Sequence, residues 1–240
     1  ENEWLCAQLL DLFGIPVAET AIATFEDQKA LLVTRFDRQR TAEGYWLRLP
    51  QEDFCQALGC QSALKYESDG GPGHAEIVEK LVYSRNGRDL ENFFRTQVLF
   101  WMLAATDGHA KNFSIRLLPG SAYEMTPMYD VLSAWPVTGQ GANLLDYKEL
   151  KLAMALRSTN AHYQLETVQA RHFVQLAARC RIPRDSALRL IEELIAMTPG
   201  AVDKAGASLP DGYPMDVFEA ITKGLQWSAD RLGRSLALGV

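Results

Sequence analysis

The chain has 240 residues, of which 48% are hydrophobic and 22% are charged, and this composition is ordinary for a soluble globular protein and unlike a disordered one. A chain of this length can form one large domain or two lobes that share a cleft. Its 24 basic and 30 acidic residues give a net charge of −6, which disfavours direct binding to nucleic acid through phosphate neutralisation. Any contact with DNA is therefore expected to come through a partner.

The cysteines and the apolar runs indicate the compartment. The four cysteines show neither a CxxC pair nor zinc-type clustering. Cys55 and Cys60 could form a redox pair, but their apolar neighbours favour buried free thiols in a reducing cytosol. No apolar run reaches the roughly 18 residues that a transmembrane helix needs, and no signal-peptide pattern is present. We therefore expect a cytoplasmic protein without membrane contact. The chain starts at Glu1 without a Met and already in a helical pattern, so it looks like a piece of something longer.

The first part of the chain predicts one helix and small β elements. Asn2 is the expected N-cap of a helix that Gly14 ends. Residues 17–25 and 29–36 are rich in β formers and predict a hairpin, and residues 45–49 predict another short strand. These predicted strands indicate a small sheet that precedes a mainly helical remainder of the chain.

Two further segments lead to the centre of the chain. Pro50 to Leu58 predicts a helix with proline in its first turn and Gly59 as its stop. Residues 65–73 form a glycine-rich loop that lacks the Gly-Lys-Ser/Thr of a Walker loop. We interpret this loop as a flexible connector, with direct phosphate binding as the alternative.

A long helix over residues 90–105, with Asp89 as its expected N-cap, should be buried because apolar side chains cover much of its circumference. Such a helix can position the loop at its end rigidly. Further helices are predicted at residues 74–83, 171–181, 184–207 and 215–236, and residues 151–156 and 163–168 are ambiguous.

The loop after the long helix carries the candidate active site. Asp107 and Asn112 are five residues apart, as are the Asp and Asn of a protein-kinase catalytic loop. Residues 113–118 and 122–127 flank a Pro-Gly turn and predict a hairpin. Its return strand should bring Asp130 back beside the loop. We therefore expect Asp107, Asn112 and Asp130 to meet.

These residue types suit phosphoryl transfer, which needs an aligned acceptor hydroxyl, Mg²⁺ on the phosphates and positive charge at the transferring group. Asp107 would accept or orient the proton of the acceptor hydroxyl, and Asn112 and Asp130 offer the hard oxygen ligands that suit Mg²⁺. His109 and Lys111 could face the γ-phosphate of ATP.

Each residue also has a structural alternative. Asp107 could cap the turn after the helix, Asn112 could occupy a left-handed position, and Lys111 could be a solvated charge. His109 could be an ordinary hydrogen-bonded loop histidine. Other chemistries fit less well, because the sequence has no GxSxG or HExxH motif and its four histidines are scattered.

With these residues in place, the chain resembles the C-terminal part of HipA-type serine/threonine kinases, the toxins of bacterial toxin–antitoxin pairs. The segments that carry the resemblance are Asn2–Trp4, Arg35–Asp37, Leu49–Gln56, Lys65–Gly73, Ala105–Ser114, Thr126–Asp130, Lys151–Met154 and Arg171–Phe173. Together they are distributed over most of the chain.

The resemblance implies an α+β fold, bilobal and protein-kinase-like, with an incomplete small β lobe and a mainly helical large lobe. Residues 1–36 would be the remainder of the small lobe, with a hinge near residues 34–37. Residues 37–240 would be the helical lobe, with the catalytic loop at 104–114 and a metal-binding segment at 126–131.

The resemblance also implies the use of ATP and Mg²⁺. Asp107 would be the catalytic base with His109 beside it, and Asn112 and Asp130 would be the metal ligands. The nucleotide would be bound by the backbone of Thr34, Arg35 and Phe36 at the adenine and by His109, Lys111, Asn112 and Asp130 at the phosphates.

Family members typically phosphorylate an aminoacyl-tRNA synthetase, which halts translation, and are neutralised by a small DNA-binding antitoxin. DNA would thus be contacted only through the antitoxin. The family's phosphate-binding loop and strand lysine precede the helix that begins at Asn2, so this chain lacks them, and Glu3 is placed where it could pair with that lysine. We expect this region either to have been cut away or to be a separate N-terminal subunit.

Two other functions stay open. One is a catalytically incomplete kinase-like module that binds an antitoxin or an N-terminal subunit. The other is a small-molecule kinase of the aminoglycoside type, suggested by the Asp-x-His-x-x-Asn spacing of Asp107, His109 and Asn112. Ala105 stands where that type has a second histidine, which disfavours it.

Overall fold

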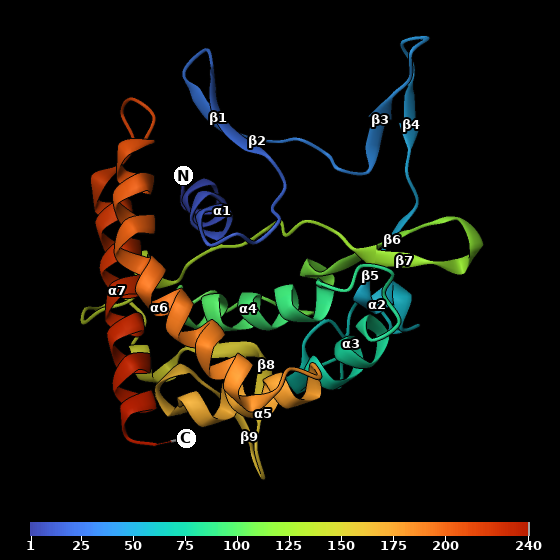
Figure 1. Ribbon diagram of the computed structural model, residues 1–240. Coiled ribbons are helices and arrows are strands. Elements are labelled where there is room, and N and C mark those ends of the chain that lie inside the picture. Colours follow the sequence, from blue (N-terminus) through green and yellow to red (C-terminus); the bar gives the residue numbers. More distant parts are fainter. Residues whose placement is uncertain (240) are drawn as a thin grey trace.

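The computed structural model describes residues 1–239, which form a helical body with two hairpins standing on it (Figure 1). The helices are α1 (Asn2–Leu12), α2 (Phe54–Ala57), α3 (His74–Leu81), α4 (Asp89–Met102), α5 (Ala170–Arg179), α6 (Arg184–Ala207) and α7 (Met215–Ala237). The strands are β1 (Thr20–Phe25), β2 (Gln28–Val33), β3 (Arg38–Arg40), β4 (Trp46–Arg48), β5 (Gln51–Asp53), β6 (Ser114–Leu117), β7 (Tyr123–Met125), β8 (Lys151–Arg157) and β9 (Ala161–Gln164).

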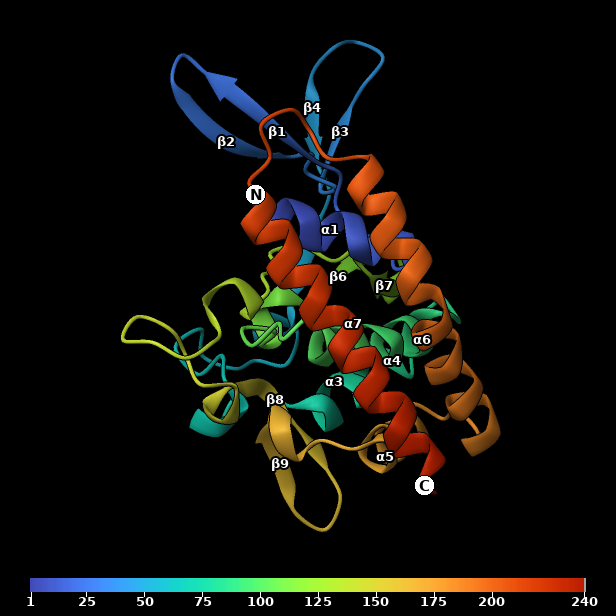
Figure 2. The same ribbon diagram turned by 90° about the vertical axis from the view of Figure 1, so that its left-hand side faces the viewer.

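Helix α4 is the centre of the body. Its apolar side chains, among them Phe93, Phe94 and Trp101, are buried on several sides of the helix. Helices α6 and α7 pack against each other along one side of the body, and α5 lies near the β8–β9 hairpin at the opposite end from β1 and β2 (Figures 1 and 2). The predicted buried central helix is confirmed.

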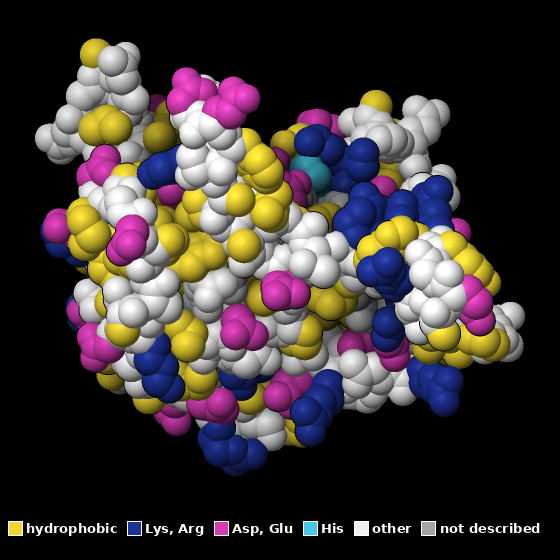
Figure 3. Space-filling model, turned by 90° about the horizontal axis from the view of Figure 1, so that it is seen from above, with side chains coloured by type: hydrophobic (Ala, Val, Ile, Leu, Met, Phe, Trp, Pro, Cys, Tyr) yellow, Lys and Arg dark blue, Asp and Glu magenta, His cyan; other side chains and the backbone are white. Residues whose placement is uncertain are grey.

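The β1–β2 and β3–β4 hairpins form two separate two-stranded antiparallel sheets that project from the body (Figure 2). Their large hydrophobic side chains are mostly open to solvent. Those with high exposure are Phe25, Leu32, Val33, Tyr45, Trp46 and Leu47. Seen from above, Lys and Arg side chains gather on the side of the face where β3 and β4 lie (Figure 3). The predicted hairpin over residues 17–36 and the strand at 45–49 are confirmed.

The sheet β5–β6–β7 contacts the first residue of α4 through Met125 and carries the chain from the candidate catalytic loop back toward Asp130. Ile115 in β6 pairs with Glu52 in β5 and with Met125 in β7. The hairpin predicted after the loop is therefore confirmed. Because the end of β7 pairs with the start of β6, the segment from β7 to Asp130 leaves the sheet at the edge where the candidate catalytic loop enters it.

The helix predicted from Pro50 is wrong at its start. Residues 51–53 pair with β6 as strand β5, and α2 begins only at Phe54. Asp53 is the true cap: its side chain accepts from the Gln56 backbone at 2.9 Å, and the Gln56 side chain accepts from the Asp53 backbone at 3.0 Å. This capping box outweighs the preference of proline for a first helical turn.

Two predicted N-caps are also wrong, because tertiary partners use the side chains. Asn2 is already helical, and it donates to the Ser133 carbonyl at 2.8 Å and accepts from the Ser133 backbone at 2.9 Å. Asp89 is the first residue of α4 and is buried. It accepts hydrogen bonds from Ser84, Asn86 and the Met125 backbone, which join α4 to β7.

The four cysteines are free thiols, three of them buried and Cys60 partly exposed. Within residues 1–239, no helix combines the length and apolar character needed to span a membrane.

Candidate active site

The loop after α4 is folded back tightly over the helix that carries it. Ala104 adopts a left-handed conformation with φ of +48°, which turns the chain sharply after α4. At Gly108 a β-carbon would overlap the Phe100 ring, so glycine is required there by close packing. The Ala104 carbonyl accepts from the Ala134 backbone at 3.0 Å. The loop is thus fixed by the body on both sides of Asp107.

Asn112 and Asp130 meet, although they are 18 residues apart in the sequence. Asn112 Nδ2 donates to Asp130 Oδ2 at 2.8 Å. Asn112 is 2% exposed, and its Oδ1 accepts from the His109 backbone at 3.2 Å. Asp130 is exposed and has a φ of +57°, a conformation that Asp tolerates better than most residues. The strained backbone turns its carboxylate toward Asn112.

Asp107 is linked to this pair through His109, whose backbone N–H donates to Asn112, and its carboxylate is largely accessible. Its side chain is 55% exposed, and the Tyr66 hydroxyl donates to Oδ1. His109 Nε2 lies 3.8 Å from the same oxygen. The hydrogen bond to Asp107, followed by burial, raises the pKa of Tyr66 to about 12, so the phenol remains a donor at neutral pH. Asp107 is therefore oriented without being enclosed.

His109 is buried beneath Asp107. Burial lowers its pKa more than the nearby Asp107 charge raises it, which favours the neutral ring at neutral pH. The ring meets the Tyr66 ring edge to face at 5.0 Å. Within residues 1–239 its Nδ1 has no hydrogen-bond partner. A neutral ring can offer only a hydrogen bond to a phosphate and no positive charge.

Lys111 is turned toward a different neighbour. Its ammonium group donates to the Ser62 hydroxyl at 2.8 Å, while its carbonyl accepts from the Tyr129 hydroxyl at 2.8 Å. The Tyr129 hydroxyl also lies 2.6 Å from Ser114 Oγ. Tyr129 thus ties the loop to β6 one residue before Asp130. In this structure the Lys111 side chain holds the loop and contacts neither Asp107 nor Asp130 through a hydrogen bond or an ion pair.

Glu3 in α1 brings a second carboxylate to Asp130. The two hydrogen bonds between Asn2 and Ser133 hold the start of α1 against the segment after Asp130. Burial and then the Asp130 charge raise the pKa of Glu3, and both residues line one small recess with Val33 of β2. The charge of Asp130 disfavours the ionised form of Glu3, and a cation between the two carboxylates would relieve that repulsion.

The donor set fits Mg²⁺. Mg²⁺ keeps several waters and takes one or two protein oxygens, and the Asp130 carboxylate is a ligand of this kind. Asn112 presents its amide nitrogen to Asp130 while its Oδ1 accepts from the His109 backbone, so it would offer that oxygen to a metal ion by turning its amide. No cluster of three or more acidic, His or Cys side chains suited to a metal occurs in the described part of the chain. A Mg²⁺ site in a phosphate-binding protein does not need such a cluster, because phosphate oxygens and water supply the remaining ligands.

The predicted hinge is held by a charge network. Asp37 is 3% exposed, and Arg35 binds both of its carboxylate oxygens, at 2.7 and 2.6 Å. Arg38 adds a contact of 2.5 Å. The Arg35 hydrogen bond, more than any other contact, lowers the pKa of Asp37. The Phe36 ring lies 5.8 Å from the Tyr129 ring, so the segment from Thr34 to Phe36 approaches the residue that precedes Asp130.

Thr34 and Arg35 also line an open recess of about 500 Å³, together with Arg38 and Trp46 from the β3–β4 hairpin. Thr34 continues the backbone pairing of β1 and β2, because its N–H donates to the Glu19 carbonyl at 2.8 Å. The three residues predicted at the adenine are therefore brought to the base of both hairpins.

The glycine-rich loop at residues 65–73 is held by side-chain contacts and brings Tyr66 to Asp107, which differs from the flexible connector that we expected. Glu67 accepts from the Ala155 backbone at 2.5 Å and pairs with Arg157, which clamps the loop to β8. At Gly71 a β-carbon would overlap the Leu64 carbonyl. Sequence reasoning missed Tyr66, whose only signal was an aromatic hydroxyl inside a loop of charged residues and glycines.

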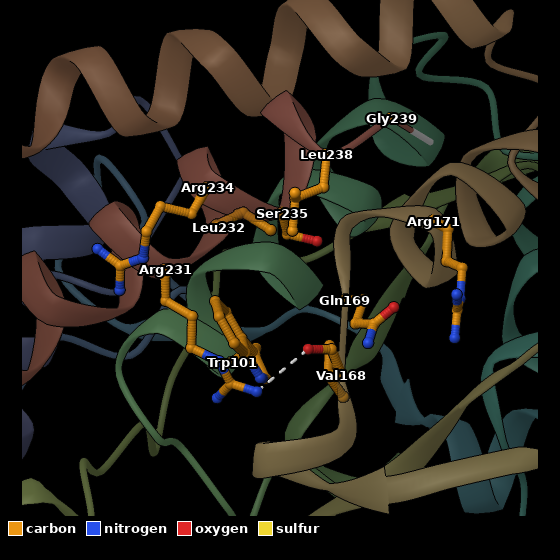
Figure 4. Close-up of a pocket in the computed structure, with 10 residues that line it drawn as sticks. All are labelled: Trp101, Val168, Gln169, Arg171, Arg231, Leu232, Arg234, Ser235, Leu238 and Gly239. Atoms are coloured by element: carbon orange, nitrogen blue, oxygen red, sulfur yellow. Dashed lines mark hydrogen bonds between the residues drawn. The ribbon is translucent and has the colours of Figure 1, made fainter.

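A different cavity, of about 400 Å³, lies at the end of α7 (Figure 4). Arg231 projects into it beside Trp101, and its guanidinium carbon is 5.3 Å from the Trp101 ring centre. The guanidinium donates to the Tyr147 hydroxyl at 2.7 Å and to the carbonyls of Leu165, Glu166 and Val168. These contacts satisfy its donors, so this cation serves packing between α7 and the segment before α5.

Comparison with known proteins identifies the family of the chain. Residues 1–202 match the family described as HipA-like C-terminal domain. The chain is 31% identical over 215 residues to "Putative kinase Y4mE" of Sinorhizobium fredii, covering 89% of this chain and 48% of that protein. It is 28% identical over 232 residues to "Serine/threonine-protein kinase toxin HipA" of Shewanella oneidensis, covering 91% and 50%. The chain thus spans about half the length of these curated relatives.

Two solved structures show the same fold. One is HipA of Shewanella oneidensis MR-1 in complex with HipB and operator DNA, with a TM-score of 0.82 and 24% identity over 99% of this chain and 56% of that one. The other is the proinflammatory kinase CtkA of Helicobacter pylori, with a TM-score of 0.59 and 10% identity over 100% and 87%. The predicted α+β, protein-kinase-like fold is confirmed, and the chain belongs to the family of HipA-like C-terminal domains.

Proposed function

We propose that this chain is the core of a serine/threonine protein kinase that transfers the γ-phosphate of ATP to a protein hydroxyl. The observation that carries the proposal is the contact of Asn112 with Asp130 at 2.8 Å, joined through His109 to the accessible carboxylate of Asp107. The kinase names of two relatives support the same reaction class. Residues 1–36 with the hinge near 34–37 would face the nucleotide base, and the rest of the chain would supply the catalytic loop.

In this proposal Asp107 aligns the acceptor hydroxyl and takes its proton. As the acceptor oxygen bonds to the γ-phosphorus, the bond to the bridging oxygen of ADP breaks, and ADP leaves with that electron pair. Asn112 and Asp130 would hold Mg²⁺, which when bound neutralises phosphate charge. His109, kept neutral by burial, supports Asp107 from beneath and can donate a hydrogen bond to the γ-phosphate. Lys111 would reach the phosphate only by leaving Ser62.

The biological setting is proposed from the relatives. The Shewanella protein is named a toxin, and its structure is a complex with HipB and operator DNA. We propose the corresponding role here: a toxin of a toxin–antitoxin pair, acting in the cytoplasm, that arrests translation and growth by phosphorylating a protein such as an aminoacyl-tRNA synthetase. A small DNA-binding antitoxin would be its partner and its link to DNA.

A second candidate has its own observation. The β1–β2 and β3–β4 hairpins expose large hydrophobic side chains, with Trp46 at 65% and Phe25 at 58%. Two-stranded ribbons of this kind are marginal alone and are stabilised by packing against further structure. The chain could therefore be a kinase-like module that works only when an antitoxin or a separate N-terminal subunit covers these hairpins.

Calorimetric titration of Mg·ATP separates the two candidates. The parent chain, Asp130→Asn and the control Asp211→Asn, an exposed loop residue, would be titrated with Mg·ATP and with ATP plus chelator. The kinase-core proposal expects Mg²⁺-dependent binding in the parent and the control, weakened at least about tenfold in Asp130→Asn. Equal binding by Asp130→Asn would overturn the metal-ligand assignment. No binding by the parent would contradict the self-sufficient core and favour the module.

A further inference from the structure

Two cysteines that the proposed function does not use lie at the C-terminal end of α2. After the helix ends, Gly59 adopts a left-handed φ of +65°, and its N–H donates to the Gln56 carbonyl at 3.0 Å. The N–H of Cys60 donates to the Cys55 carbonyl at 2.7 Å. These two hydrogen bonds form a Schellman motif, which brings the residue after the glycine toward the residue five positions before it. Cys55 and Cys60 are therefore neighbours through the geometry of the helix end.

The hydrogen bond between the two cysteines limits the distance between their Cα atoms. An amide nitrogen lies about 1.5 Å from its own Cα atom, and a carbonyl oxygen lies about 2.4 Å from its own. With 2.7 Å between the Cys60 nitrogen and the Cys55 oxygen, the two Cα atoms are at most about 6.6 Å apart. Disulfides join Cα atoms that are about 4.4 to 6.8 Å apart. The pair therefore meets the distance condition for a bridge.

The two thiols differ in their access to solvent. Cys55 is 1% exposed, whereas Cys60 is partly exposed. Burial, and then the charge of Asp53, raises the pKa of Cys55 to about 11, and the neighbouring Cys60 thiol adds to the shift. Oxidants react with accessible thiolates, so Cys60 is the thiol that meets an oxidant from solvent. Cys55 stays protonated beside it and is placed to react with the oxidised sulfur.

The Cys60 thiol also holds the turn that contacts the candidate catalytic loop. It donates to the carbonyls of Gln61 and Leu64, at 3.7 and 3.5 Å. Ser62 lies inside this turn, and its hydroxyl accepts from the Lys111 ammonium group at 2.8 Å. A disulfide sulfur has no hydrogen to donate, so conversion of Cys60 to a disulfide removes both thiol hydrogen bonds. The state of this thiol therefore acts on the turn that holds Lys111.

We propose that Cys55 and Cys60 form an oxidation site, in which a hydroperoxide converts the two thiols to a disulfide and the turn at residues 61–64 releases Lys111. The bridge goes beyond the proposed function, because oxidation of the thiols does not require phosphate transfer. Its consequence for the site rests on the proposed function, in which Lys111 reaches the phosphate only by leaving Ser62. In a reducing compartment such disulfides are transient and serve to sense oxidation.

The chemistry balances with the hydroperoxide as the only co-reactant. Cys60 Sγ attacks the terminal peroxide oxygen, the O–O bond breaks, and the departing oxygen takes the thiol proton, which leaves a sulfenic acid on Cys60. Cys55 Sγ then attacks Cys60 Sγ, so that the S–S bond forms and the S–O bond breaks. The hydroxide that departs takes the Cys55 proton and becomes water. The two thiols lose two electrons, and hydrogen peroxide is reduced to two molecules of water.

Mass spectrometry after treatment with hydrogen peroxide tests the bridge. The whole chain is reduced, freed of reductant, treated with peroxide, alkylated and digested with trypsin without further reduction. Peptide 49–65, which contains both cysteines, should escape alkylation and be about 2 Da lighter than its reduced form. In Cys55→Ser the reaction should stop at a sulfenic acid on Cys60 that dimedone traps, and Cys60→Ser should give neither product. Cys180→Ala removes a buried thiol elsewhere, so it is the control and should still form the bridge.

Acylation of lysines tests the coupling to the catalytic loop. Lys111 should react with an N-hydroxysuccinimide ester at least about threefold faster in the bridged chain than in the reduced chain, because its hydrogen bond to Ser62 is lost. Lys148, an exposed lysine in another part of the chain, should react equally in both forms. Cys60→Ser treated with peroxide should show no acceleration at Lys111, because it cannot form the bridge. Far-UV circular dichroism of each variant separates a loss of reaction from misfolding.

The outcomes separate this inference from the proposed function. A peptide 49–65 that keeps two alkylatable thiols, or oxidation past the sulfenic acid without a bridge, would overturn the oxidation site. A bridge without faster acylation of Lys111 would overturn its coupling to the catalytic loop. Mg·ATP binding by the reduced chain reports on the proposed function alone. Its absence together with the expected bridge would contradict the kinase core and leave the oxidation site standing.

Discussion

The catalytic loop and the two projecting hairpins are built in opposite ways. In the loop, Asn112 and His109 are buried, and Tyr129 binds both the loop and β6. In the hairpins, each strand has one partner, and side chains such as Trp46 and Phe25 are exposed to 65% and 58%. The half of the site that would act on the acceptor is fixed by the body, whereas the half that would face the nucleotide base is carried on ribbons.

The difference implies that the catalytic loop and the proposed nucleotide-base site differ in rigidity. Positions supported by a buried core and by hydrogen bonds stay within the narrow limits that proton transfer and metal binding need. Two-stranded ribbons with few buried contacts open at low cost in free energy. We therefore expect the loop to keep its arrangement without ligand, while the hairpins respond to whatever covers them.

The largest expected effect is on phosphate transfer in Asp107→Asn. Asparagine keeps the size of the side chain and can still contact the Tyr66 hydroxyl, but it cannot take the acceptor proton. General-base catalysis accounts for about 10²- to 10⁴-fold in rate, so transfer of labelled γ-phosphate should fall by about that factor. Circular dichroism should be unchanged. Full transfer by this variant would remove Asp107 from the mechanism.

Arg231→Lys should cost about 2 kcal/mol of the free energy of unfolding, because lysine keeps the charge but cannot serve several carbonyls with a planar fork. The guanidinium also lies over the rings of Trp101, Tyr147 and Trp227, at 5.3, 5.8 and 5.5 Å. Urea unfolding measures the loss. Arg234→Lys, at an exposed position on the same helix, is the control and should change stability little. Equal costs would contradict the role given to Arg231.

Tyr66→Phe should lower the rate of phosphate transfer about tenfold while leaving the dissociation constant of Mg·ATP unchanged, because the ring packing stays and only the hydrogen bond to Asp107 is lost. Tyr83→Phe changes a side chain that is 75% exposed and serves as the control. A weaker Mg·ATP complex in Tyr66→Phe would indicate a nucleotide contact and not the orientation of Asp107.

His172 should make stability depend on pH. Burial, then the charges of His162 and Arg171, lower its pKa from 6.5 to about 4. Above pH 6.5 the ring is neutral in both states. As the pH falls from 6.5 toward about 4, the unfolded chain takes up the proton first, so the free energy of unfolding decreases.

His172→Asn should remove about 1 kcal/mol of the stability loss between pH 7.5 and 5.5. Asparagine can still accept from the Gln169 backbone, as His172 Nδ1 does at 3.1 Å. The readout is the difference between urea midpoints at the two pH values for the parent and the variant. The same difference in both proteins would show that His172 is not the titrating group.

Local patterns in the sequence predicted much of the body and of the candidate site. The apolar coverage of α4, the spacing of Asp107 and Asn112 and the Pro-Gly turn between β6 and β7 are short-range signals, and the structure contains each element that they indicate. The meeting of Asn112 and Asp130 followed from the hairpin alone. The catalytic roles of these residues remain predictions.

The errors came from contacts between distant segments. Pro50 suggested a helix, but pairing with β6 made residues 51–53 a strand. Asp89 suggested a cap, but the Met125 backbone uses its carboxylate at 2.6 Å. Tyr66 reaches Asp107 across 41 positions of sequence, and no local pattern encodes such a contact. Each case is a tertiary partner that overrides a local preference.

The smallest effect should come from Trp46→Ser in the β3–β4 hairpin, and it bears most directly on the comparison. A side chain that is 65% exposed loses little burial when truncated, so the free energy of unfolding should change by less than about 0.5 kcal/mol. Phe113→Ala, at a buried ring beside the catalytic loop, should cost about 3 to 5 kcal/mol. A cost above about 1 kcal/mol for Trp46→Ser would mean that the hairpin is already covered, for instance by a second copy of the chain. A matching concentration dependence of the unfolding midpoint would identify that cover, because self-association stabilises by mass action whereas packing within one chain does not.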